Sequence, residues 1–182
     1  MAPPLRGIIL IGMRGAGKTT VGALLATRLG WTFDDLDEHA LRRSGLPTVR
    51  DVFAQQGEPA WRTLESDSIR DVLTGINARS GGGAVLAVGG GAPSDPRSAA
   101  QLRRARSEGW RIVWLRTSVA RLVERLQACE GDRPRLTPAP LDQELAALHA
   151  ARSAGYESLA DLTVDGDAPP ADVSATLASA LA

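Results

Sequence analysis

The feature that most constrains this 182-residue chain is a glycine-rich segment near its start. Residues 12–19 read Gly-Met-Arg-Gly-Ala-Gly-Lys-Thr and match the pattern G-x-x-x-x-G-K-[ST] at every fixed position. An apolar run at residues 7–11 directly precedes the segment, and apolar residues at helical spacing follow it over residues 19–29. We therefore predict a buried parallel strand, a tight turn and a helix, in that order.

A turn of this kind has a specific chemistry. Glycines let successive backbone N–H groups point at phosphate oxygens, and the helix N-terminus adds positive potential. Lys18 would then reach the outer phosphates of a nucleotide, and the Thr19 hydroxyl would hold magnesium. The alternative is a plain glycine-rich turn with a solvated lysine. Because Lys18 is the one lysine among 21 basic residues, its use here is selective, which favours a nucleotide-binding loop.

Strands and helices are predicted to alternate along the rest of the chain. Short apolar runs indicate further strands at residues 31–33, 84–88, 112–115 and 162–164, with helical patterns between them. Such alternation favours a three-layer α/β fold, in which helices cover both faces of a parallel sheet. Residues 127–140 are rich in Arg, Pro and Gly, which predicts a surface loop or lid. Residues 1–182 are expected to form one domain.

Two aspartates follow the second predicted strand, at the edge where open parallel sheets bind their ligands. Of this pair, Asp35 and Asp37, one can bind a magnesium-coordinated water and the other can orient or deprotonate an attacking hydroxyl. An acidic first helical turn would explain the same residues. The sequence alone leaves both interpretations open.

Arg62 and Glu65 lie three residues apart on a predicted helix, residues 58–73, and can therefore pair. An arginine steadied in this way suits the bidentate binding of a carboxylate, whereas an ordinary surface ion pair would contribute little. The triple glycine at residues 89–91 follows a buried strand, where missing side chains would let a ligand approach the backbone.

Three further arginines are candidates for binding charged groups. Arg133 in the predicted lid, with Arg125 on the helix before it, can neutralise a transferred phosphate. Arg152 lies near the end of a helix, where a cation is favourable in itself. For the lid arginine, a solvated side chain is the alternative.

Composition excludes several other classes of function. Acidic and basic residues balance at 21 each, so no overall field draws the chain to nucleic acid or an anionic membrane. The apolar run at residues 8–11 is too short for a secretory core or a membrane span, so we expect a cytoplasmic protein. A single cysteine, Cys129, cannot form an internal disulfide, and His39 and His149 lack the spacing of zinc ligands.

Together these segments resemble the shikimate kinases, a family of nucleoside monophosphate kinase-like P-loop enzymes. Six elements in order carry the resemblance: residues 12–19; F-x-D-x-D at Phe33, Asp35 and Asp37; G-E-x-x-aromatic-R-x-x-E at 57–65; the glycines at 89–91; Arg133-Pro134; and R-x-x-x-Y at Arg152 and Tyr156. The resemblance implies a five-stranded parallel sheet of order 2-3-1-4-5 with flanking helices and a lid. Arg135 and Gly155 depart from the family, which more often has an apolar residue and Leu there.

The resemblance also implies a reaction: ATP phosphorylates the 3-hydroxyl of shikimate, giving shikimate 3-phosphate and ADP in aromatic amino acid biosynthesis. The nucleotide would be bound by Gly12, Gly15, Ala16, Gly17, Lys18, Thr19, Thr20, Arg125 and Arg133, and Mg2+ by Thr19 and Asp35. Shikimate would be bound by Asp37, Arg62, Gly89, Gly90, Gly91 and Arg152. Lys18, Asp37 and Arg133 would be catalytic, with Asp37 as the base. We expect a monomer without nucleic-acid or membrane partners.

Two alternatives remain from the sequence. A kinase of the same architecture can act on a close analogue, such as aminoshikimate or gluconate, although two clamping arginines suit a rigid cyclic carboxylate better. A protein that binds nucleotide without catalysis is the second alternative, and it would show no turnover with any carboxylated polyol.

Overall fold

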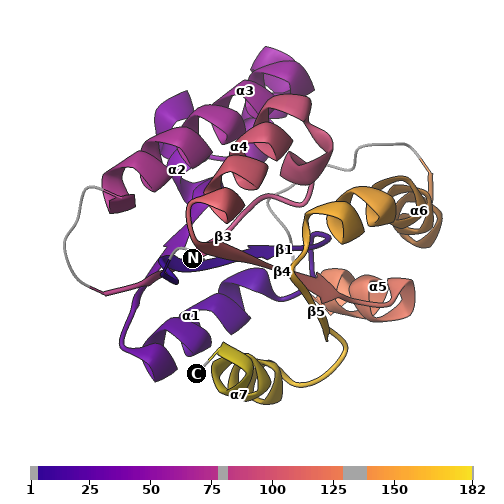
Figure 1. Ribbon diagram of the computed structural model, residues 1–182. Coiled ribbons are helices and arrows are strands. Elements are labelled where there is room, and N and C mark those ends of the chain that lie inside the picture. The colour runs from indigo at the N-terminus through magenta and orange to yellow at the C-terminus, as the bar shows by residue number, and fades with distance from the viewer. Residues whose placement is uncertain (1–3, 78–81, 129–138, 182) are drawn as a thin grey trace.

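A computed structural model of the chain describes residues 4–77, 82–128 and 139–181 (Figure 1). Five parallel strands form one sheet of order β2-β3-β1-β4-β5. The strands are β1 (Gly7–Ile11), β2 (Thr32–Asp35), β3 (Ala84–Ala87), β4 (Trp110–Arg116) and β5 (Leu162–Asp165). The predicted strand order and parallel α/β fold are thus confirmed.

Helices cover the sheet on both faces. They are α1 (Lys18–Leu29), α2 (Leu36–Ser44), α3 (Val49–Asn77), α4 (Pro96–Ser107), α5 (Val119–Ala128), α6 (Leu141–Leu159) and α7 (Pro170–Leu181), with a short 3-10 helix η1 (Ala92–Ser94). In Figure 1, α1 and α7 lie below the sheet, and α2, α3 and α4 lie above it. Among the residues described, none of these helices has the length and apolar character needed to cross a membrane.

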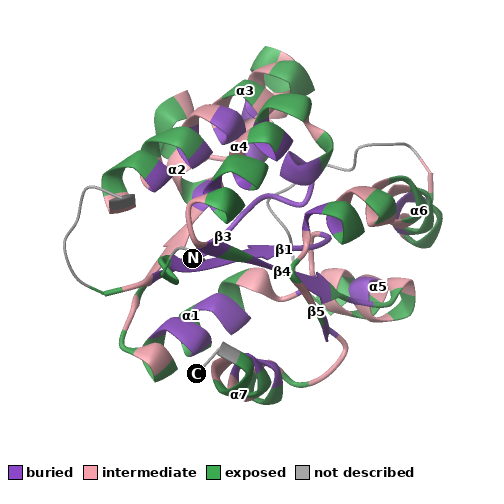
Figure 2. Ribbon diagram, viewed as in Figure 1, coloured by how far each residue is buried: buried purple, intermediate pink, exposed green. Residues whose placement is uncertain are grey.

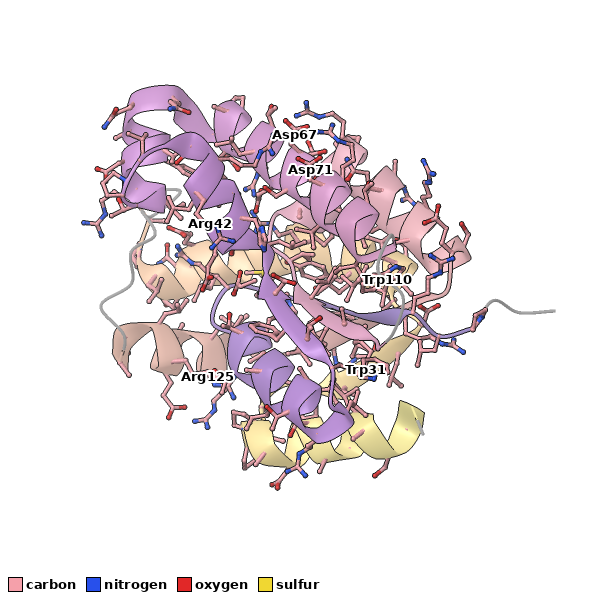
Figure 3. All side chains as sticks on the ribbon, turned by 90° about the vertical axis from the view of Figure 1, so that its left-hand side faces the viewer. Trp31, Arg42, Asp67, Asp71, Trp110 and Arg125 are labelled. Carbon is pink, nitrogen blue, oxygen red and sulfur yellow. The ribbon has the colours of Figure 1, made fainter. Side chains whose placement is uncertain are left out.

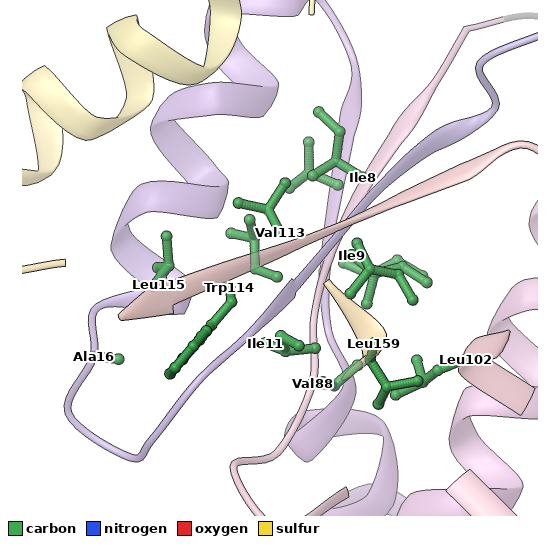
Figure 4. Packing of buried hydrophobic residues seen from close by; sticks show 14 of the residues in the cluster. Ile8, Ile9, Ile11, Ala16, Val88, Leu102, Val113, Trp114, Leu115 and Leu159 are labelled. Carbon is green, nitrogen blue, oxygen red and sulfur yellow. The ribbon is translucent and has the colours of Figure 1, made fainter. Parts of the chain in front are cut away.

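The central strands form the core because their side chains are buried on both faces. Residues 8–11 of β1 are fully buried, and successive side chains alternate between the two faces. Ile8 therefore packs with Val113 on one face, whereas Ile9 packs toward Leu102 of α4 on the other (Figure 4). Figure 2 shows the same division, with buried residues along the strands and exposed residues on the outer helix surfaces.

Helix α3 contains the helix that the sequence predicts at residues 58–73. The helical segment Val49–Asn77 has a kink at Gly57, whose φ of 82° and ψ of 169° are not helical, and the predicted helix begins directly after this kink. Pro59 lies just after this kink, where the chain needs no helical N–H from it. The kink reorients the second half of α3, which carries Arg62 and Glu65.

The predicted lid, residues 127–140, lies mostly outside the described residues. Gln127 and Ala128 end α5, and Ala139 and Pro140 precede α6. Arg133, Arg135 and Cys129 fall among the residues that the structure does not describe.

Candidate active site

The glycine-rich loop connects the end of β1 to the start of α1. Its glycines have left-handed φ values of 143° at Gly12, 80° at Gly15 and 92° at Gly17, which side-chain-bearing residues rarely adopt. Gly17 occupies the N-cap position of α1, so no side chain covers the helix N-terminus there. The backbone therefore has the strand, turn and open helix end that bind phosphate in such loops.

Lys18 begins α1 and folds back over the loop. Its Nζ donates hydrogen bonds to the carbonyl oxygens of Gly12, at 3.0 Å, and Met13, at 2.9 Å. These bonds hold the ammonium group beside the turn that would receive the outer phosphates.

Thr19 and Asp35 connect α1 to the end of β2. The Thr19 hydroxyl donates to Asp35 Oδ2 at 2.6 Å, while Asp35 Oδ1 accepts from the backbone N–H of Asp37 at 3.0 Å and caps α2. Asp35 thus caps α2 and also contacts a residue of the nucleotide loop, so its position is compatible with both interpretations of the aspartate pair. A hydroxyl and a carboxylate are hard oxygen ligands of the kind Mg2+ takes, with phosphates and waters completing its shell. Within the described residues, no group of three or more His, Cys, Asp or Glu side chains could hold a metal by itself.

The triple glycine after β3 lies where three polar side chains converge. A Cβ atom on Gly89 would overlap the Glu65 carboxylate and lie 2.7 Å from Asp37 Oδ1, and a Cβ on Gly91 would overlap the Arg62 guanidinium. Any larger residue at either position would require these side chains to move. The structure therefore brings together Asp37, Arg62 and the glycines that were predicted to bind the acceptor.

Arg62 is held by two carboxylates. Its Nη1 donates to Glu65 Oε2 at 2.6 Å, and its Nε and Nη2 donate to Glu58 Oε1 at 3.1 and 2.5 Å. Burial lowers the pKa of Arg62, but the charges and hydrogen bonds of Glu65 and Glu58 outweigh it, so the pKa is raised. The guanidinium is thus both charged and fixed in orientation, as bidentate binding of a carboxylate requires.

Glu65 is itself buried, with 2% of its surface exposed, so its pair with Arg62 is not a surface ion pair. Burial raises the pKa of the Glu65 carboxyl, while the charge of Arg62, the Trp61 indole and the charge of Arg152 oppose that rise. The influence of Arg152 places its charge near the same carboxylate, although it comes from α6 rather than α3.

Tyr156, on α6, binds the backbone of the triple glycine. Its hydroxyl donates to the Gly90 carbonyl at 2.6 Å, lies 3.5 Å from Met13 Sδ and is fully buried. Burial raises the pKa of Tyr156 to about 12, although the charge and hydrogen bond of Arg152 oppose the rise. Arg152 and Tyr156, one turn apart on α6, thus contact each other next to the triple glycine.

Arg125 lies on the nucleotide side of the loop. Its Nη1 donates to the carbonyl oxygens of Gly15 and Ala16 at 3.3 and 3.2 Å, and Figure 3 shows it beside α1. Thr20 is exposed in the first turn of α1. At Gly155, where the family often has Leu, a Cβ would lie 3.8 Å from the Pro93 carbonyl, an ordinary contact.

Sequence reasoning missed Arg14 and Glu144. Arg14 Nη2 donates to Glu144 Oε1 at 2.6 Å, across 130 positions of sequence. No local spacing connects two residues so far apart. Glu58 belongs to the predicted element at residues 57–65, but its pairing with Arg62 was not predicted, although a spacing of four residues on a helix is a signal for pairing.

A sequence profile of the family described as shikimate kinase matches residues 14–182. The chain belongs to the shikimate kinase family. A shikimate kinase of Geobacter sulfurreducens is 39% identical over 160 residues, covering 88% of this chain and 81% of that one. Shikimate kinase 2 of Sodalis glossinidius is 38% identical over 168 residues, covering 91% and 90%.

A solved member of the family has the same fold. Shikimate kinase from Acinetobacter baumannii, in complex with shikimate, superposes with a TM-score of 0.84 at 29% identity, covering 97% of this chain and 93% of that one. Sequence and structure therefore agree on the shikimate kinase family over nearly the whole chain.

Proposed function

We propose that this enzyme of the shikimate kinase family transfers the γ-phosphoryl group of ATP to the 3-hydroxyl of shikimate. One observation carries the proposal: Asp37, Arg62 and the glycines at 89–91 meet directly beside the nucleotide loop. A Cβ on Gly90 would lie 3.0 Å from the backbone nitrogen of Arg14 and 3.1 Å from the Gly12 carbonyl. An acceptor on the glycines would thus be next to phosphates held by the loop.

The acceptor side suits a carboxylated polyol. We assign the substrate carboxylate to Arg62, fixed by Glu65 and Glu58, and to Arg152, which approaches from α6. Asp37 lies beside Gly89 and Arg62 lies beside Gly91, and we assign the substrate hydroxyls to Asp37. In the transfer, the oxygen of the 3-hydroxyl forms a bond to the γ-phosphorus, its proton passes to Asp37, and the bond from the γ-phosphorus to ADP breaks.

The nucleotide side is assigned to the residues of the loop, Thr20 and Arg125. Lys18 neutralises charge on the outer phosphates, and Arg125 lies near the far end of the loop. Thr19 and Asp35 fit a Mg2+ ion, which when bound would neutralise charge on the β- and γ-phosphates. Arg133 is proposed to bind phosphate from the lid at residues 127–140.

The remaining features of the proposal are a single domain over residues 1–182, a monomer and a cytoplasmic location. The balanced charge of the sequence supports an absence of nucleic-acid and membrane partners.

A comparison of acceptors tests the assignment. ADP release is measured with shikimate, aminoshikimate and gluconate at equal ATP and Mg2+, and kcat/KM is compared. We expect shikimate to give the highest value, by about 100-fold or more over open-chain gluconate, because the two arginines suit a rigid cyclic carboxylate. Faster turnover of gluconate would instead assign a sugar-acid kinase, and binding of ADP without any turnover would assign a nucleotide-binding protein.

A further inference from the structure

A buried ion pair joins the nucleotide loop to α6. The side chains of Arg14 and Glu144, 2.6 Å apart, are 15% and 0% exposed. Glu144 lies in the first turn of α6, where the helix N-terminus favours a carboxylate. Removing two charges from water nevertheless costs free energy that their attraction often only balances, so stability alone is a weak reason for such a pair. Its location points to another role.

Helix α6 contacts both halves of the site. Near its C-terminal end, Tyr156 binds the Gly90 carbonyl and touches Met13, the residue before Arg14 in the loop. Arg152, on the same helix, interacts with Tyr156. Near its N-terminal end, Glu144 binds the side chain of Arg14 itself. Two adjacent loop residues are thus attached to opposite ends of the helix that presents Arg152.

We propose that Arg14 and Glu144 are a positioning pair that fixes the nucleotide loop relative to α6, and so aligns the γ-phosphoryl group with the acceptor. This inference rests on the proposed kinase function. Arg14 acts through the position of the loop backbone, because Glu144 holds its guanidinium. The backbone nitrogen of Arg14 lies against Gly90, so a shift of the loop would change the distance between the donor and the acceptor. A misplacement of about 1 Å can reduce a rate by about 100-fold.

The test uses the full chain with Glu144→Gln, Arg14→Met and the double variant. We expect kcat for shikimate phosphorylation to fall by about 10- to 100-fold in each single variant. The KM values for ATP and shikimate should each stay within about threefold, since loop amides and Arg62 still bind them. The double variant should be no slower than the slower single one, because the two residues act as a unit.

Asp142→Asn is the matched control. Asp142 is an exposed carboxylate in the same first turn of α6, so its loss has the same effect on the helix N-terminus without touching the loop. We expect its kcat to stay within about twofold of the unmutated chain. Circular dichroism checks folding, and if Glu144→Gln does not fold, the double variant carries the test because it removes both charges.

Four results would overturn the pair's role. The first three concern kcat: no change in the single variants, a loss in the double variant equal to the product of the two single losses, or a loss in Asp142→Asn as large as in Glu144→Gln. The fourth is a KM for ATP that rises only in Arg14→Met. The last result would mean that Arg14 binds phosphate directly. No turnover of shikimate by the unmutated chain would overturn the proposed function, and with it this inference. Normal turnover of shikimate by the unmutated chain, together with an unchanged kcat in the Arg14 and Glu144 variants, would overturn only the proposed role of the pair.

Discussion

The hydroxyl of Tyr156 donates a 2.6 Å hydrogen bond to the carbonyl of Gly90, in the middle of the triple glycine that borders the proposed acceptor site. The phenol is fully buried and also contacts Arg152 and Met13. One side chain therefore contacts the triple glycine, the proposed carboxylate-binding Arg152 and the nucleotide loop at once.

This contact predicts an unusual titration. Tyr156 is the one tyrosine of the chain, so phenolate absorbance near 295 nm reports it alone. Burial raises its pKa to about 12 in the folded chain, against about 10 in an unfolded one. The stability that Tyr156 contributes is fully present below pH about 10 and is lost as the pH rises through about 12. A midpoint near 10 under conditions where circular dichroism shows a folded chain would contradict the buried contact.

Gly89→Ala should weaken the use of the acceptor. The added Cβ would overlap the Glu65 carboxylate and approach Asp37, so both side chains would have to move. We expect kcat/KM for shikimate to fall by about 100-fold or more, while binding of ADP, measured by calorimetry, changes little.

Gly75→Ala is the control for that substitution. A Cβ on Gly75, within α3, meets no atom within 4 Å. Alanine there should raise the free energy of unfolding by up to about 1 kcal/mol and leave activity unchanged. Equal effects of the two substitutions on activity would show that the glycine requirement at residue 89 is not steric.

Arg62→Lys should weaken acceptor binding although it keeps the charge. Lysine lacks the planar fork that lets Arg62 bind Glu65 and Glu58 while facing the pocket. We expect the KM for shikimate to rise by about 10- to 100-fold and the KM for ATP by less than about threefold. Arg70→Lys, on an exposed part of the same helix, should change neither. An equal rise for both substrates would refute the carboxylate assignment.

Asp35→Asn should keep the role of residue 35 as the N-cap of α2 and remove the negative charge proposed to bind Mg2+. Asparagine still caps a helix, so α2 should remain folded within about 1 kcal/mol. The lost charge should raise the Mg2+ concentration for half-maximal rate by about tenfold. A Mg2+ titration of initial rates checks this, and an unchanged midpoint would remove Asp35 from the metal site.

Local patterns explain why much of the fold was predictable. The loop glycines, Lys18 and the apolar runs signal their structures within a few residues, and the predicted loop between β1 and α1 is present. The pairing of Arg62 with Glu65 also follows from spacing alone. The burial of Glu65, which distinguishes a site from a surface ion pair, depends on the packing of α3 against the residues after β3 and has no local signal.

Long-range contacts were the part that the sequence did not reveal. Arg14 and Glu144 meet only because the loop after β1 lies beside the first turn of α6 in the finished fold. The break at Gly57, by contrast, was predictable, because glycine followed by Glu58 and Pro59 has the local pattern of a helix boundary.

The most direct test of the account is shikimate-dependent ADP release in the presence of Mg2+, measured for the unmutated chain and for Lys18→Met. We predict that the unmutated chain releases ADP and forms shikimate 3-phosphate in equal amounts. Lys18→Met should lose this turnover by about 1,000-fold. ADP release that does not depend on shikimate, or that survives in Lys18→Met, would contradict the claim that the loop and the glycine-bordered pocket form one kinase site.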